Sequence, residues 1–255
     1  MKRTKTGIKG LDKLLNGGIP KNHVVLLSGQ TGAGKSILGL EYIVKGALNY
    51  GEKGIFISFE QSKDDIISQA KEFGWKIKDL EEKDAVRILT FKPSKAHIGR
   101  IVRDMENKVK EFNPSRLVFD SISTYGVYAE TLGYFEEIMS LGLKKEEINL
   151  GLTPESVSRK TIMNIMEKIK SFGVTSLVIS ELPEESNYLS RDTISEFLAD
   201  GVIILSYLGI GGTDSSTLQI RKMRQTNHEK GFIPFEITSS GIKLKPEEKT
   251  TTVLK

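Results

Sequence analysis

Short apolar runs alternate with segments of helical apolar spacing along this chain of 255 residues. The runs are rich in β-branched residues and too short for helices, so each predicts a strand. Strands are expected at 24–28, 54–59, 86–90, 116–120, 175–180, 202–205 and 217–224. Helical spacing is found at 37–44 and 154–172, where Pro154 suits a first helical turn. This alternation predicts an α/β fold with a mainly parallel central sheet flanked by helices.

The pattern predicts a single domain over residues 1–245 and a short polar tail at 246–255. Residues 125–153, which follow the strand at 116–120, are expected to form an insertion. Apolar side chains recur there at helical spacing, at Tyr134, Phe135, Ile138, Met139 and Leu141. Two interpretations stay open for this segment, which are packing into the core and a surface that binds a partner protein.

A glycine-rich loop joins the first of these strands to the helix after it. It has the P-loop pattern G-x-x-x-x-G-K-S, in which backbone N–H groups surround phosphate oxygens. The lysine of this pattern reaches the β and γ phosphates, and the serine hydroxyl holds Mg²⁺. The residues expected to bind ATP here are Gly29, Gln30, Thr31, Gly32, Ala33, Gly34, Lys35, Ser36 and Ile37. The pattern therefore predicts ATP and Mg²⁺ as the cofactors, with Lys35 also in a catalytic role.

Two carboxylates end strands of the same predicted sheet. Asp120 is expected at the carboxyl edge, where it would hold Mg²⁺ opposite Ser36. The alternative for Asp120 is a cap of the helix that follows. Glu60 would take the proton from the water that attacks the γ-phosphate. Its alternative is an acidic residue favoured near the next helix N-terminus, where Ser62 and Asp65 resemble a capping box.

The composition of the chain excludes several other classes of protein. A hydrophobic content of 38% suits a substantial core, and the absence of cysteine excludes disulfides and thiolate metal sites. With neither a long apolar run nor a signal-peptide pattern, we expect a cytoplasmic protein and no membrane partner. Residues 1–13 carry five basic residues against Asp12, which accounts for the net charge of +4. This N-terminal arm is either solvated or in contact with an acidic partner.

Several further segments resemble the KaiC-type ATPases, a branch of the RecA/RadA superfamily. They occur in the family's order, at 6–12, 15–20, 59–62, 196–205, 222–228 and 231–235. The resemblance implies a RecA-like ATPase core that assembles into a homo-oligomeric ring, usually a hexamer, with ATP between subunits. It also implies that Glu60 is the catalytic carboxylate. By the same resemblance, Lys222, Arg224 and His228 reach nucleotide bound to the neighbouring subunit.

Two departures from the family pattern bear on activity. Gln61 stands where the family commonly has a second acid, so hydrolysis is slow or rests on Glu60 alone. Gln225 stands where a glycine usually follows the arginine. Alternation along 217–224 places Lys222 and Arg224 on the strand face of Leu218 and Ile220, with Met223 opposite. The alternative is two solvated charges at a sheet edge.

Three functions follow from these observations. The first is a ring-forming KaiC-like ATPase, and the second is a DNA-dependent recombinase-type ATPase. The third is an ATP-gated scaffold that hydrolyses slowly or not at all. Nucleic acid is an unfavourable partner, because the segments 125–154 and 181–196, where RecA relatives bind DNA, are both net acidic. An unidentified protein partner remains open.

Overall fold

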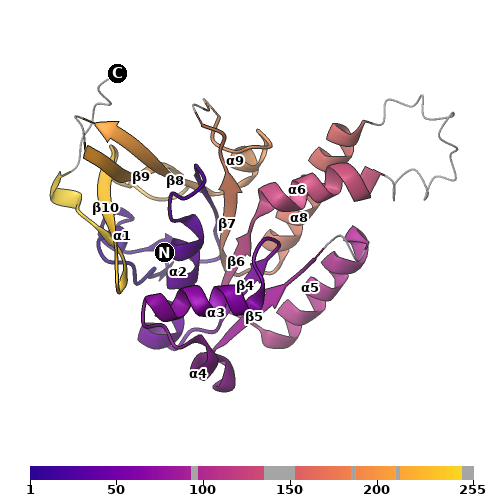
Figure 1. The fold of residues 1–255 in the computed structure, drawn as a ribbon, viewed down its shortest axis with the longest axis horizontal. Helices are drawn as coiled ribbons and strands as arrows, with labels where there is room; N and C mark the ends of the chain where they lie inside the picture. Colours follow the sequence, from indigo (N-terminus) through magenta and orange to yellow (C-terminus); the bar gives the residue numbers. More distant parts are fainter. Residues whose placement is uncertain (93–96, 135–152, 185, 187, 211–212, 249–255) are drawn as a thin grey trace, which may run out of the picture.

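The computed structural model describes residues 1–92, 97–134, 153–184, 186, 188–210 and 213–248. A nine-stranded sheet forms its centre, with the strand order β11-β10-β9-β8-β3-β7-β6-β4-β5 (Figure 1). The strands are β3 Val24–Gly29, β4 Gly54–Ser58, β5 Val86–Thr90, β6 Arg116–Asp120, β7 Thr175–Glu181, β8 Gly201–Ile210, β9 Thr213–Met223, β10 Ile233–Thr238 and β11 Gly241–Leu244. Six of them, β3 to β8, are parallel, and β9 to β11 continue the sheet antiparallel.

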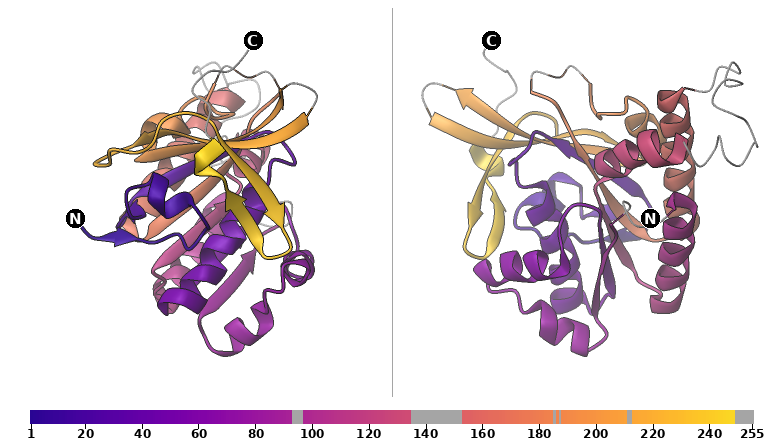
Figure 2. Two further views of the ribbon diagram at one scale, coloured as in Figure 1. Left: turned by 90° about the vertical axis from the view of Figure 1, so that its left-hand side faces the viewer. Right: turned by 45° about the vertical axis from the view of Figure 1, so that its right-hand side comes forward.

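Helices cover both faces of the parallel part of the sheet (Figures 1 and 2). Their bounds are α1 Leu11–Leu14, α2 Lys35–Tyr50, α3 Lys63–Glu72, α4 Ile77–Glu82, α5 Ile98–Phe112, α6 Ile122–Tyr128, the π-helix η2 Ala129–Gly133, α8 Pro154–Ser171, α9 Ser195–Leu198 and the 3₁₀ helix η4 Pro246–Glu248. Residues on one face of the strands pack with α1 to α4, and those on the other face pack with α5, α6 and α8. Because the parallel strands are buried on both faces, their sequences are continuous apolar runs.

The seven expected strands and both expected helices are present, and Pro154 occupies the first turn of α8 as predicted. The capping box is also confirmed, because the Ser62 and Asp65 side chains each bond the other residue's backbone N–H. Sequence inspection missed β10, β11 and the short pair β1 Arg3–Thr4 and β2 Ile19–Pro20. The last two span only two residues each, which is too short for alternation to be visible.

The N-terminal arm is not a free segment. β1 pairs with β2, and Ile8, Leu11 and Leu14 are buried in the core. The Arg3 guanidinium donates hydrogen bonds to the carbonyl of Gly18 at 2.8 Å and to that of Leu15 at 3.2 Å. The interpretation of this segment as a wholly solvated arm is therefore wrong, although its lysines remain exposed.

The first part of the expected insertion continues α6 as the π-helix η2. Phe135, Ile138, Met139 and Leu141 lie outside the described residues, as do positions 249–255 of the expected tail. Within the described ranges, no helix combines the length and the apolar character needed to cross a membrane.

Candidate nucleotide site

The glycine-rich loop connects the end of β3 to the start of α2, as predicted. Gly34 precedes α2 with a φ of 92°, a left-handed conformation that favours glycine. A side chain at Gly29 would place its Cβ 2.2 Å from the carbonyl oxygen of Leu205 on β8. Both glycines are therefore required by the path of the backbone. They bring the first turn of α2, with its free N–H groups, to the carboxyl edge of the sheet.

Lys35 begins α2 and is buried, with 4% of its surface exposed. Its Nζ donates to the carbonyl of Gln30 at 2.7 Å and lies 2.9 Å from Oε1 of Glu181. The Thr31 hydroxyl donates to Oε2 of the same carboxylate at 2.8 Å. The ammonium thus sits inside the loop that is expected to surround the phosphates.

Asp120 ends β6 and is almost fully buried, with 1% exposed. Burial, and then the Glu60 charge, raise the pKa of its carboxyl to about 7, while the nearby Ser36 hydroxyl and Lys35 ammonium oppose the shift. Both carboxylate oxygens lack a hydrogen-bond partner within the described structure. A buried acid with free oxygens beside a serine hydroxyl fits a hard divalent cation such as Mg²⁺.

The capping alternative for Asp120 is wrong. Ser121 is the N-cap of α6, and its hydroxyl accepts a hydrogen bond from the backbone N–H of Thr124 at 3.1 Å. The Asp120 side chain therefore does not cap α6.

Glu60 follows β4, which pairs with β6 so that Ser58 lies opposite Asp120. Oε1 of Glu60 accepts hydrogen bonds from the hydroxyls of Ser121 at 2.5 Å and Thr124 at 2.6 Å. The carboxylate is thus held against the start of α6 rather than used to cap α3, whose N-cap is Ser62. The buried side-chain oxygen of Gln61 has no partner among the described atoms.

Sequence inspection missed Glu181 as a residue of this site. It is the last residue of β7 and lies opposite Gly29 of β3 in the sheet. The available signal was the rule that singled out Glu60 and Asp120, an acid at the carboxyl end of a parallel strand. The expected strand stopped one residue earlier, at Ser180, so that Glu181 was assigned to the following loop.

Lys222, Arg224 and His228 do not join the other site residues within one chain. β9 runs antiparallel to β8, and Met223 pairs with Gly201, which in turn lies beside Val25 at the start of β3. Lys222 and Arg224 therefore lie at the amino edge of the parallel strands, whereas Lys35 lies at the carboxyl edge. His228 lies beyond the end of β9, where its Nδ1 is 2.9 Å from the carbonyl of Glu229.

The predicted alternation along this strand is wrong at its end. A register shift between Val202 and Ile203 leaves Arg221 as an extra, exposed residue in β9. Met223 consequently packs into the same core cluster as Leu218 and Ile220. Lys222 instead donates to backbone carbonyls at the end of α9, those of Ala199 at 2.6 Å and Glu196 at 2.9 Å. Arg224 donates to Oδ1 of Asp200 at 2.9 Å.

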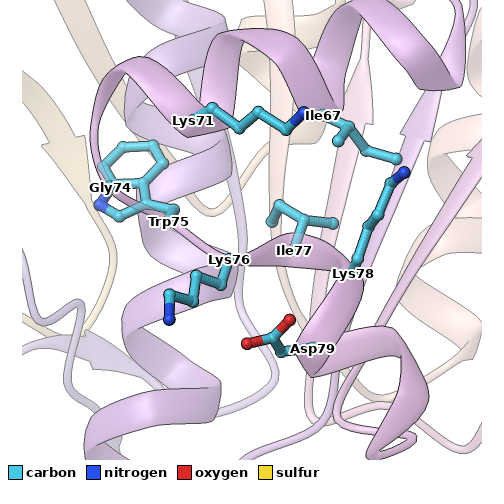
Figure 3. Close-up of a pocket in the computed structure, with 8 residues that line it drawn as sticks. All are labelled: Ile67, Lys71, Gly74, Trp75, Lys76, Ile77, Lys78 and Asp79. Carbon is cyan, nitrogen blue, oxygen red and sulfur yellow. The ribbon is translucent and has the colours of Figure 1, made fainter.

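Two surface cavities deserve comparison with this site. One of about 430 Å³ reaches the P-loop at Gly32 and is lined by Tyr207 and Ile237. A second, of about 320 Å³, lies between α3 and α4, and its lining includes Trp75, Ile77, Lys71 and Lys78 (Figure 3). No residue of the P-loop lines the second cavity, nor does Glu60 or Asp120, so it is separate from the site described above.

The family model for the KaiC ATPase matches residues 4–145 and 146–249. The chain belongs to the KaiC ATPase family. It is 27% identical over 252 residues to the circadian clock oscillator protein KaiC of Parathermosynechococcus lividus, covering 96% of this chain and 42% of that protein. With KaiC of Rippkaea orientalis the identity is 29% over 246 residues, covering 96% of this chain and 44% of the relative. The chain thus spans less than half the length of these relatives.

A solved structure agrees with this assignment. The crystal structure of a KaiC-like protein from the hyperthermophilic archaeon Pyrococcus horikoshii superposes with a TM-score of 0.79 at 31% identity. The match covers 96% of this chain and 99% of that one. The resemblance to the KaiC-type ATPases and the predicted RecA-like α/β core are confirmed.

Proposed function

We propose that this protein binds ATP with Mg²⁺ at the β3–α2 loop and hydrolyses it slowly, in a ring of copies that share each site. The buried Asp120 carboxylate with two unpartnered oxygens is the observation that carries the proposal. Its position beside Ser36, at the edge where the P-loop opens, suits it to hold a divalent cation. Membership of an ATPase family gives independent support.

Different groups of the chain would bind different parts of the nucleotide and its metal ion. The loop N–H groups and the Lys35 ammonium would hold the β and γ phosphates, and the cavity at Gly32 would accept the rest of the nucleotide against Tyr207 and Ile237. Ser36 and Asp120 would hold Mg²⁺, Asp120 through water. When bound, Mg²⁺ neutralises phosphate charge and orients the β and γ phosphates for in-line attack.

Glu60 is proposed as the base that receives the proton of the attacking water. Its Oε1 already accepts two hydroxyl donors, from Ser121 and Thr124. These two donors fix the orientation of the carboxylate. Because Gln61 cannot replace it, this arrangement favours slow hydrolysis. Glutamine at position 61 also supports the alternative function of an ATP-gated scaffold with negligible turnover.

The positions of Lys222 and Arg224 support sites that are shared between two copies of the chain. Lys222 and Arg224 lie at the sheet edge opposite their own P-loop, so they would reach phosphate charge only on another copy. A cation placed on the γ-phosphate of a neighbour would offset the charge that develops there in the transition state. His228 would take part from the segment that follows the strand.

One set of measurements tests the proposal. Light scattering after size exclusion, with and without ATP and Mg²⁺, reports assembly, and phosphate release reports turnover. The Lys35→Ala variant should lose nucleotide binding, and Asp120→Asn should lose the enhancement of binding by Mg²⁺. The exposed Lys21, which lies before β3, gives the matched control Lys21→Ala. Wild-type affinity in Lys35→Ala would contradict the site, and turnover without assembly would contradict the shared-site part.

A further inference from the structure

Glu181 is bound to two side chains of the P-loop at once. One carboxylate oxygen lies 2.9 Å from Nζ of Lys35, and the other accepts the Thr31 hydroxyl at 2.8 Å. The backbone fixes the carboxylate in this place, because the N–H of Glu181 donates to the Ser123 hydroxyl at 2.8 Å. The next residue, Leu182, donates to the carbonyl of Gly29 at 2.9 Å. Glu181 is therefore built into the loop that is to hold the phosphates.

The surroundings of this ion pair are acidic and partly shielded from water. The Lys35 side chain is 3% exposed and that of Glu181 is 28% exposed. Asp120 and Glu181 end the neighbouring strands β6 and β7, and Glu60 lies two residues beyond the end of β4, the next strand in the sheet. Among the described residues, Glu181 is the only acid within ion-pair distance of Lys35.

We propose that Glu181 sets the affinity for the nucleoside triphosphate, because its carboxylate competes with the β and γ phosphates for the Lys35 ammonium. This inference rests on the proposed function and assigns a new positioning residue to it. In a P-loop the lysine contacts those two phosphates. A polyanion that takes this position meets the Glu181 charge at close range, where like charges interact far more strongly than in bulk water.

Glu181 has two opposite effects on binding, and their sizes differ. By holding Thr31 and Lys35 it orders the loop, which favours binding. As an anion beside phosphate it disfavours binding. The first effect depends on hydrogen bonds that a neutral acceptor also provides, whereas the second depends on the full negative charge. The competing effect should therefore dominate, and removal of the charge alone should tighten binding.

The Glu181→Gln substitution removes that charge and keeps both contacts, since the amide oxygen can accept from Lys35 while the amide N–H donates to the Thr31 hydroxyl. The probe is the β,γ-imido analogue of ATP with Mg²⁺, titrated calorimetrically beside ADP. We expect the dissociation constant for the triphosphate to fall about tenfold in Glu181→Gln, and that for ADP to fall less. Glu184→Gln, three residues further on, makes the same change in net charge and should leave both constants unchanged.

The outcomes separate this inference from the proposed function. Unchanged or weaker triphosphate binding by Glu181→Gln would overturn it, provided that the thermal midpoint of the variant matches that of the wild type. An equal gain in Glu184→Gln, or equal gains for ADP and the triphosphate, would also overturn it, because neither requires competition at Lys35. Failure of the wild-type protein to bind either nucleotide would instead contradict the proposed function. The wild-type titration is therefore carried out before any variant is compared.

Discussion

The Glu60 carboxylate accepts a 2.5 Å hydrogen bond from the hydroxyl of Ser121, the residue directly after Asp120. The proposed base is thus held by the residue next to the proposed metal ligand in the chain, although the two acids come from different strands. Ser121 also caps α6, so the start of this helix is part of the same arrangement. The start of α6 therefore sets the orientation of the Glu60 carboxylate.

Glu60→Gln should separate nucleotide binding from hydrolysis. An amide cannot take a proton from water at neutral pH, so turnover should fall by about 10²–10⁴, or roughly 3–5 kcal/mol in the barrier. Affinity for the non-hydrolysable analogue should stay near that of the wild type. Phosphate release and calorimetry measure the two quantities. The exposed Glu72→Gln on α3 is the control, and equal turnover in Glu60→Gln and wild type would refute the role.

Thr124→Val should lower turnover without weakening nucleotide binding. Valine keeps the shape of threonine but removes the hydroxyl that donates to Glu60 at 2.6 Å. Looser orientation of the carboxylate should reduce the rate by about tenfold, since small displacements of catalytic groups are costly. Thr131→Val, which removes a hydroxyl bonded only to backbone carbonyls of α6, is the control. An unchanged or faster rate would mean that the Thr124 contact restrains Glu60 rather than positions it.

Glu41 should make the folded state less stable as the pH rises. This residue of α2 is 2% exposed and accepts the N–H of Ile242 at 2.7 Å. Burial raises its pKa from 4.5 to about 7, while that hydrogen bond and Lys45 oppose the shift. Because the folded pKa is raised, the protein binds this proton more tightly than the unfolded chain does. Its contribution to stability is therefore full below about pH 4.5 and is lost as the pH rises through about 7.

The variant Glu41→Gln tests this dependence in denaturant unfolding at several pH values. Near pH 4.5 the free energy of unfolding of the variant should match that of the wild type. Above pH 7 it should exceed that of the wild type by up to about 3 kcal/mol. Glu82→Gln, at an exposed position on α4, should run parallel to the wild type. A constant difference between Glu41→Gln and wild type across the range would show that Glu41 does not titrate with folding.

The parts of the site that could be predicted are those set by local sequence. The P-loop needs glycines at fixed spacing, and parallel strands bring their last residues to one edge, which sufficed to place Lys35, Asp120 and Glu60 near that edge. The hydroxyls of Ser121 and Thr124 could not be assigned to Glu60, because the contact depends on how α6 packs against β4. Sequence spacing carries no information on such packing.

The end of β9 shows a second limit. A single extra residue, Arg221, reverses the faces of the residues after it, so alternation placed Lys222 and Met223 on the wrong faces relative to Leu218 and Ile220. Nothing in the composition of this strand marks the bulge. The placement of Lys222 and Arg224 at the amino edge, in contrast, needed only the knowledge that β9 runs antiparallel to β8.

Subunit mixing tests the shared site most directly. Lys35→Ala lacks a working P-loop, and Arg224→Ala lacks the distal arginine, so each alone should be inactive. Arginines that reach a neighbour's phosphates are worth roughly 10³–10⁵ in rate, or about 4–7 kcal/mol. In a mixed assembly, some interfaces pair the intact P-loop of one variant with the intact arginine of the other. Phosphate release by the mixture should therefore return in part, in proportion to such interfaces. A mixture that exchanges subunits, as shown by energy transfer between labelled copies, yet stays as inactive as its components would contradict the account.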